Sequence, residues 1–312
     1  MSWTFVALAG YFFNAVAALF DKYLLADRIK APAVYAFFVS LFSLFALVFV
    51  PFGFQFFSWY NTFILLCSGF LFLYGLVAFY VAVKGNEISR VAPLVGTVVS
   101  LTALLVVFFP SALEMHGITS GQVFSLFLLI AGGLLLSFDL PLRRDERIPG
   151  LVLVAGVLMA FSLLLLKYGY AEANFASGLV WSRLGIFLGG LTLLFVPSYR
   201  KHIFADCCHF SKPTRFAIGT GAIFVVNKIC AGVGSFLIAY ATFLGPVAFV
   251  QALSGMQYVF LLVLALPLAA RYPFVFDEKL FFWDWFQKIF AITLIATGIW
   301  IASMSGIKLL TI

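Results

Sequence analysis

The sequence predicts an all-α polytopic membrane protein, with ten transmembrane helices arranged as two inverted five-helix repeats. Three observations predict this fold: the composition, a series of long apolar runs, and a short segment that recurs 145 residues later. The 312 residues are 64% hydrophobic and only 10% charged, and 40 of them are Phe. A soluble fold of this length would need many more charged residues to cover its surface.

The apolar runs are long enough to be transmembrane helices, each of which needs roughly 20 residues. Short polar or Gly/Pro segments separate them, and we expect spans near residues 2–20, 32–51, 62–83, 89–109, 119–138, 150–168, 176–196, 215–241, 246–268 and 286–306. Continuous runs favour helices over the alternating pattern of an outer-membrane barrel. No Lys or Arg precedes the first run, so we expect no removable signal peptide.

The basic residues follow the pattern of a membrane protein and do not indicate nucleic-acid binding, despite a net charge of +7. Fifteen of the 19 Lys and Arg fall on the side reached after odd-numbered spans, against Lys167 and Lys308 on the other side. Positive charge is retained in the cytoplasm, so ten spans predict that both termini lie outside it.

The cysteines and histidines predict no metal site and no cofactor. Cys67 and Cys230 lie within spans, where free Cys is usually small apolar filling. Cys207, Cys208, His202 and His209 lie together in the loop after the seventh span, but without standard zinc-ligand spacing.

The segment LFDKYLLAD, residues 19–27, returns as LLLKYGYAE, residues 164–172. This pairing places Lys22 over Lys167 and then Asp27 over Glu172. The hydropathy stays in register beyond the point where identity fades, which is typical of an internal repeat.

Two further pairings extend the repeat to the rest of each half. Residues 88–96 lie over 247–255, and residues 131–137 lie over 296–302. We therefore divide the chain into 1–148 and 149–312, with five spans in each part. Five is an odd number, so the second repeat must enter the membrane from the opposite face.

On these features the chain resembles the drug/metabolite transporter superfamily in its ten-helix EamA-like form. The residues that carry the resemblance are Lys22, Lys167, Arg183 and the passages AFYVAVKGNEISRVAPL and IAYATFLGPVAFVQAL. It covers nearly the whole chain and implies a transporter, which we place in the bacterial inner membrane. The oligomeric state stays open, with a homodimer as one alternative. The chain departs from the pattern in its external termini and in having Phe38 at the position equivalent to Arg183.

Two cations lie deep within predicted spans, Arg183 in the seventh and Lys228 in the eighth. No Asp or Glu lies comparably deep, and a charge inside a span costs at least about 2.5 to 3.5 kcal/mol. Such cations predict a site for an anionic or zwitterionic solute, with Asn227 and Asn14 as further contacts. The alternative is structural: Arg183 bonds to carbonyl groups, and Lys228 extends along its helix to the interface.

The ninth span carries a polar stripe of Gln251, Ser254, Gly255 and Tyr258 on one helical face. These side chains either line the path of the solute or hold the helix against a neighbour. We favour the lining role and include Gln251, Ser254 and Tyr258 among the binding residues.

Four residues near span ends are candidates for gating, namely Lys22, Lys167, Tyr80 and Tyr240. Each Lys could close one end of an alternating-access path by pairing with Asp27 or Glu172. A structural role is also open, because a cation at a helix C-terminus stabilises the last carbonyl groups. The two Tyr residues could instead mark the membrane interface.

We expect a transporter, not an enzyme, that moves a small anionic or zwitterionic metabolite by alternating access between halves that meet at the midplane. No nucleotide-binding loop is present, so exchange, proton coupling or facilitation remain open. The other hypotheses are a flippase for a lipid-linked phosphate or sugar, and a structural or receptor-like membrane protein. An intramembrane enzyme would need clustered acids or a nucleophile with a base, and we find neither.

The predicted topology can be tested by cysteine labelling in intact cells. The charge distribution places the loop that contains Arg144 in the cytoplasm. We expect an impermeant thiol reagent to leave Arg144→Cys unlabelled until the cells are permeabilised. Labelling before permeabilisation would reverse the predicted orientation.

Overall fold

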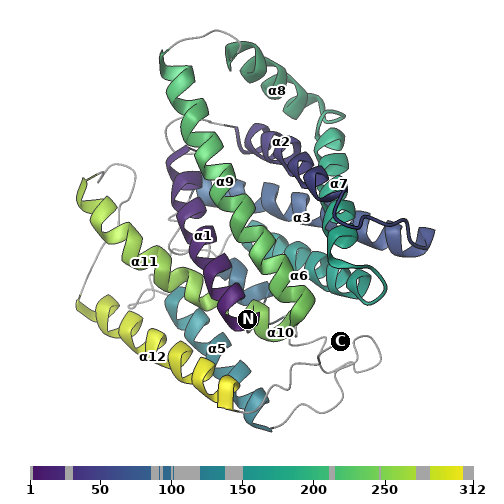
Figure 1. Ribbon diagram of the computed structural model, residues 1–312. Coiled ribbons are helices and arrows are strands. Elements are labelled where there is room, and N and C mark those ends of the chain that lie inside the picture. The colour runs from purple at the N-terminus through teal and green to yellow at the C-terminus, as the bar shows by residue number, and fades with distance from the viewer. Residues whose placement is uncertain are drawn as a thin grey trace.

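The computed structural model describes residues 3–24, 31–85, 91, 94–99, 101, 120–137, 150–210, 215–245, 247–271 and 282–304. These residues are mostly helical, and no strand occurs among them. The helices are α1 (Trp3–Tyr23), α2 (Pro32–Ser43), the 3-10 helix η2 (Leu44–Phe49), α3 (Trp59–Gly85), α5 (Ser120–Ser137), α6 (Gly150–Tyr170), α7 (Phe175–Leu193), α8 (Pro197–Phe210), α9 (Arg215–Leu244), α10 (Val247–Ala252), α11 (Ser254–Arg271) and α12 (Phe282–Met304). Figure 1 shows α1 beside α9, with α5 and α12 at one end of the bundle and α2, α7 and α8 towards the other.

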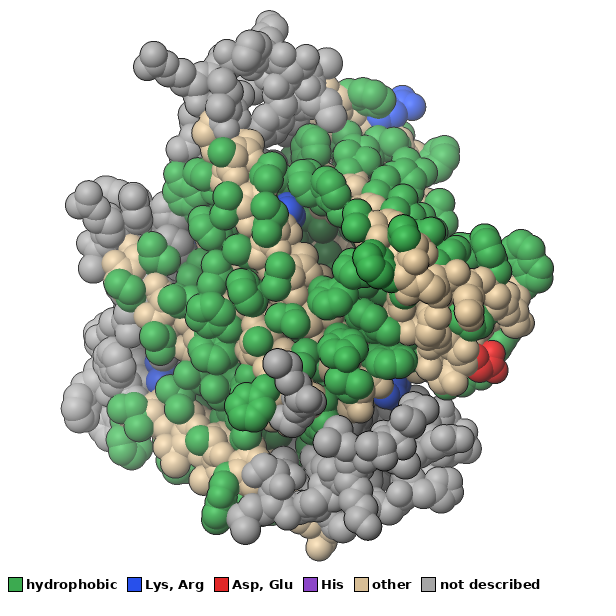
Figure 2. All heavy atoms as spheres, viewed as in Figure 1, with side chains coloured by type: hydrophobic (Ala, Val, Ile, Leu, Met, Phe, Trp, Pro, Cys, Tyr) green, Lys and Arg blue, Asp and Glu red, His purple; other side chains and the backbone are tan. Residues whose placement is uncertain are grey.

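The described helices confirm the all-helical class and a multi-pass integral membrane protein. Six helical stretches are long and apolar enough to cross a membrane, namely α1, Pro32–Phe49, Trp59–Lys84, α6, α7 and Gly221–Leu244. The surface carries large apolar side chains, including Trp59, Phe195 and Phe5, which are 90%, 83% and 73% exposed. Figure 2 shows apolar side chains over most of the described face, with few charged ones. This surface suits contact with lipid and not with water.

Two predicted segments differ in detail from the structure, and a third is largely untested. The span expected at 89–109 lies largely outside the described residues, although 94–99 is helical. The span expected at 246–268 is two helices, α10 and α11, interrupted at Leu253. The loop after the seventh span contains α8, which the sequence analysis missed because its residues alternate between polar and apolar without forming a long run.

Local sequence explains where α2 and α7 begin. Pro32 occupies the first turn of α2, where its missing N–H leaves no helical hydrogen bond unmade. Asn174 caps α7, since its Oδ1 accepts a hydrogen bond from the Ser177 N–H at 2.9 Å. The same side chain donates from Nδ2 to the carbonyl oxygen of Gly53 at 2.7 Å. Gly53 has a φ of 92°, which favours glycine. The cap therefore ties the connection after η2 to the start of α7.

The helix pairs are related by exchange of the two halves of the chain. The first and eighth spans pack together as α1 and α9, and the sixth and third pack together as α6 and α3. If each predicted span is replaced by its counterpart in the other half, the pair of α1 with α9 becomes the pair of α6 with α3. This replacement leaves unchanged the pairing of α2 with α7, the second and seventh spans, and of α5 with α12, the fifth and tenth.

The crossing of α1 with α9 and that of α6 with α3 have the same register. A Cβ atom at Gly234 of α9 would lie 3.0 Å from the carbonyl oxygen of Gly10 in α1. A Cβ atom at Gly75 of α3 would lie 3.3 Å from the carbonyl oxygen of Ala155 in α6. The repeat offset of 145 residues relates Gly10 to Ala155, and the offset of 159 seen in the second pairing relates Gly75 to Gly234. Equivalent residues therefore make both close approaches.

The crossing of α5 with α12 corrects the third sequence pairing by one residue. A Cβ atom at Gly132 would lie 2.9 Å from the carbonyl oxygen of Ala291, and one at Gly298 would lie 3.1 Å from that of Ser125. These contacts are equivalent at an offset of 166, whereas the sequence pairing used 165. Small apolar residues fit either register in sequence, and only the approach to a backbone carbonyl distinguishes them.

The α1–α9 crossing can be tested with two glycines of α9. Gly234→Ala places a methyl group against backbone atoms of α1, and such overpacking costs about 1–3 kcal/mol. We expect a lower melting temperature in detergent than for the unchanged protein. Gly232→Ala is the control, because nothing lies within 4 Å of its Cβ position. Equal melting temperatures for the two variants would contradict the close crossing.

Candidate functional site

Lys22 and Lys167, the equivalent lysines of the repeated segment, bind the C-terminal ends of neighbouring helices. The ammonium group of Lys22 donates to the carbonyl oxygen of Val83 in α3 at 3.2 Å. The ammonium group of Lys167 donates to the carbonyl oxygens of Thr242 at 2.9 Å, Phe243 at 3.3 Å and Gly245 at 3.1 Å, at the end of α9. Val83 and Thr242 are equivalent at the offset of 159. The two lysines therefore make the same contact in each half of the chain.

These contacts give both lysines a structural role at the ends of neighbouring helices. Each cation binds carbonyl groups at the C-terminal end of another helix, where the helix dipole also favours positive charge. The three bonds of Lys167 use all three of its N–H donors. Of the predicted acidic partners, Asp27 lies outside the described residues, and Glu172 accepts a hydrogen bond from Asn61 at 3.0 Å.

Lys228 in α9 forms a buried ion pair with Asp21 in the last turn of α1. The ammonium nitrogen lies 3.1 Å from Asp21 Oδ1, and the two side chains are only 5% and 11% exposed. The same oxygen accepts a hydrogen bond from Asn227 Nδ2 at 2.6 Å and another from the Tyr35 hydroxyl. Asn227 Nδ2 also lies 2.7 Å from the Tyr35 oxygen. These four side chains, the polar cluster, join α1, α2 and α9.

Two aromatic rings lie close to the ammonium group of Lys228. It lies 4.4 Å from the centroid of the Tyr35 ring and 5.2 Å from that of Phe224. Tyr80 of α3 packs edge-on against Tyr35, with ring centroids 4.8 Å apart. The ring faces attract the cation, so they add to the stabilisation from Asp21. Tyr80, predicted as a gating residue, is therefore buried beside the polar cluster.

The ion pair corrects the expectation that the buried charges are all positive. The first apolar run stops at residue 20, so the span predicted at 2–20 leaves Asp21 just beyond its end. The helix continues to Tyr23, and the packing of α2 and α9 encloses the carboxylate. Tyr35 was missed as well, since a Tyr inside an apolar run gives no sign of which polar group it meets.

Arg183 in α7 is half-buried and reaches α9. Its Nη2 donates to the hydroxyl of Ser235 at 3.0 Å, and its own carbonyl oxygen accepts from the Ser43 hydroxyl at 3.0 Å. Among the described residues, no carboxylate lies within 4.0 Å of its guanidinium. Ser235 follows Lys228 by seven residues, which places the two on one face of α9 about 10 Å apart.

Tyr240 belongs to an aromatic cluster near the C-terminal end of α9. Phe236 stacks on Phe49 at 5.1 Å and on Tyr240 at 6.5 Å between ring centroids. Phe175 packs edge-on against Tyr240 at 5.1 Å. The cluster joins η2, α7 and α9, so the predicted gating residue lies where three helical segments converge.

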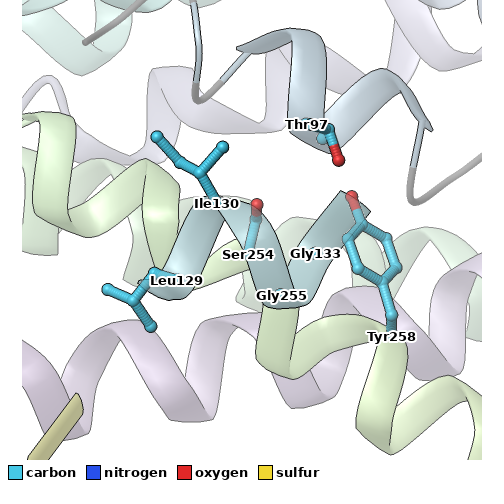
Figure 3. Close-up of a pocket in the computed structure, with 8 residues that line it drawn as sticks. Thr97, Leu129, Ile130, Gly133, Ser254, Gly255 and Tyr258 are labelled. Carbon is cyan, nitrogen blue, oxygen red and sulfur yellow. The ribbon is translucent and has the colours of Figure 1, made fainter. Parts of the chain in front are cut away.

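Asn14, Gln251, Ser254 and Tyr258 lie outside the polar cluster. Asn14 packs at the close crossing of α1 with Gly234, and Gln251 is buried in α10. Ser254 and Tyr258 line a small cavity with residues of 94–99 and α5 (Figure 3). The Thr97 and Tyr258 hydroxyl groups face each other across it. A Cβ atom at Gly96 would collide with the Tyr258 ring, so this Tyr packs α11 closely against that segment.

Five of the seven predicted binding residues therefore fall into two groups, and Asn14 and Gln251 belong to neither. Lys228 and Asn227 share the polar cluster, and Arg183 joins the same face of α9 through Ser235. Ser254 and Tyr258 line a cavity together with residues of 94–99 and of α5, none of which belongs to the polar cluster. Neither a protein-family model nor a curated protein sequence matches the chain.

The role of Lys167 can be tested by thermal unfolding in detergent. Lys167→Met removes three hydrogen bonds to carbonyl oxygens, and a hydrogen bond to a charged group contributes about 1.5–3 kcal/mol. We expect a lower melting temperature, and a change in the same direction for Lys22→Met. The control is Lys201→Met, at an exposed position of α8. If Lys167→Met melts no earlier than this control, the lysine does not stabilise the end of α9.

Proposed function

We propose that the protein is a secondary-active or facilitative transporter for a small anionic or zwitterionic metabolite. The observation that carries this proposal is the setting of Arg183. Its guanidinium lies half-buried inside the bundle, bonded to a neutral hydroxyl, with no carboxylate within 4.0 Å among the described residues. Arg offers a planar fork of N–H donors that suits a carboxylate or a phosphate.

The site lies on α9 between Arg183 and Lys228. Both side chains approach the same face of this helix, and Ser235 adds a neutral hydroxyl. A solute with an acidic group would meet the guanidinium first, because Arg183 is half-buried whereas Lys228 is 5% exposed and already paired. Asn227 belongs to the inner end of this site, since its side chain bonds to Asp21.

The repeated contacts support two inverted five-helix halves in a ten-helix transporter of the EamA-like form. Equivalent lysines bind equivalent helix ends, and equivalent residues make the two close crossings. Halves related in this way commonly alternate between outward-facing and inward-facing states around a site near the midplane. We place the protein in the bacterial inner membrane on the same resemblance.

An asymmetry between equivalent helix pairs supports alternating access. A Cβ atom at Gly69 of α3 would lie 2.7 Å from the backbone nitrogen of Ile186 in α7. The residue of α9 equivalent to Gly69 is Lys228, at the offset of 159, and it faces Tyr35 of α2. One side of the bundle is thus held by direct backbone contact, and the other by charged and aromatic side chains. In alternating access, the close contact of α3 with α7 would open when the equivalent contact of α9 with α2 closes.

The function can be tested with purified protein in liposomes, using radiolabelled glycerol phosphate, succinate and alanine as probes. Arg183→Gln should lower the initial rate of uptake of the transported probe by about tenfold to hundredfold, the loss expected for a bond to a charged group. Arg183→Lys should retain an intermediate rate, because it keeps the charge but loses the fork.

The matched control is Arg200→Gln, which removes an exposed guanidinium on α8. This variant should transport at the rate of the unchanged protein. Undiminished uptake after Arg183→Gln and Lys228→Gln together would contradict an anion site. Scrambling of a labelled lipid headgroup, with no uptake of soluble probes, would contradict solute transport and indicate a flippase.

A further inference from the structure

The buried charge of Lys228 is neutralised by the protein itself when no solute is bound. Its ammonium group lies 3.1 Å from Asp21 Oδ1, and both side chains are almost completely enclosed. A buried cation without a partner is strongly destabilising, whereas a paired one is tolerated. The empty site therefore needs no bound anion at Lys228.

The carboxylate of Asp21 has other donors besides Lys228. Asn227 Nδ2 lies 2.6 Å from Oδ1, and the Tyr35 hydroxyl donates to the same oxygen. These two neutral donors hold the negative charge in place if the ammonium group moves away. Lys228 can then exchange its partner, because its long side chain rotates about several bonds while the Asp21 carboxylate stays bonded.

Arg183 contrasts with Lys228 in its surroundings. Its Nη2 donates to the neutral Ser235 hydroxyl, and among the described residues no carboxylate lies within 4.0 Å of the guanidinium. A carboxylate or phosphate of the solute can therefore bind to this guanidinium. Of these two cations, only Lys228 has a carboxylate within 4.0 Å among the described residues, and its side chain is 5% exposed.

We infer that Asp21 is an internal counter-ion that takes the place of the negatively charged solute at Lys228 when the carrier is empty. This inference rests on the proposed transport function and states whether transport is net or requires exchange. An arriving anion bonds to Arg183 and then draws the ammonium group from Asp21, and departure of the anion restores the ion pair. Because Lys228 is neutralised both with and without solute, the empty carrier can change sides. The transporter therefore performs net transport and does not depend on exchange.

The mode can be measured first on the unchanged protein in liposomes, using the fastest of the three probes named above. Uptake into vesicles without internal probe reports net transport, and uptake into vesicles preloaded with unlabelled probe reports exchange. We expect the two initial rates to agree within about threefold, since neither direction of movement leaves a buried cation unpaired. Uptake that occurs only in preloaded vesicles would overturn the inference. Absence of uptake in both would instead contradict the proposed transport function.

The counter-ion is then removed with Asp21→Asn. This variant leaves Lys228 unpaired in the empty state, so its net transport should fall by at least about tenfold relative to its exchange. The double variant Asp21→Asn with Lys228→Gln removes both charges, so it should recover the ratio of net transport to exchange despite weaker binding of the probe. A structural role of Asp21 alone would lower both rates together and leave their ratio unchanged, which would overturn the inference. If the single variant does not fold, the rates of the unchanged protein still decide.

Discussion

The close approach of α1 and α9 brings together the polar groups inside the bundle. Gly10 and Gly234 let the two backbones meet, and Asp21 of α1 then reaches Lys228 and Asn227 of α9. A bulkier residue at either glycine would press against the neighbouring helix, whose position also sets the distance between Asp21 and Lys228. Since an unpaired buried charge is costly, packing and charge neutralisation depend on the same contact.

The sequence predicts the six membrane-crossing stretches of the described residues because lipid imposes a simple rule on them. Every backbone group must be bonded internally, so each crossing segment is a long apolar run, and such runs are visible in the sequence. Sequence also shows which lysines are equivalent, as with Lys22 and Lys167. It cannot show that these lysines bind neighbouring helices, because that depends on how the helices are arranged in space.

The polar cluster illustrates the limit of prediction from sequence more sharply. Asp21 lies at the boundary of an apolar run, where an acid usually meets water, and only the packing of α2 and α9 encloses it. Arg183 and Lys228 were recognised because charges deep in a span are conspicuous. Which helices pack together can be seen only in the structure. The structure also sets the register between α5 and α12, because a shift of one residue cannot be detected in a run of small apolar residues.

The length of α9 has a consequence for its membrane. Its 30 residues extend about 45 Å at 1.5 Å per residue, whereas the hydrocarbon layer is about 30 Å thick. The helix must therefore tilt or emerge among the lipid headgroups, and the extent depends on the host bilayer. Lys228 and Ser235 both lie on this helix, so a thicker or thinner bilayer shifts the depth of both groups together. Lipid chain length is thus a physical variable to which the interior of this protein is directly coupled.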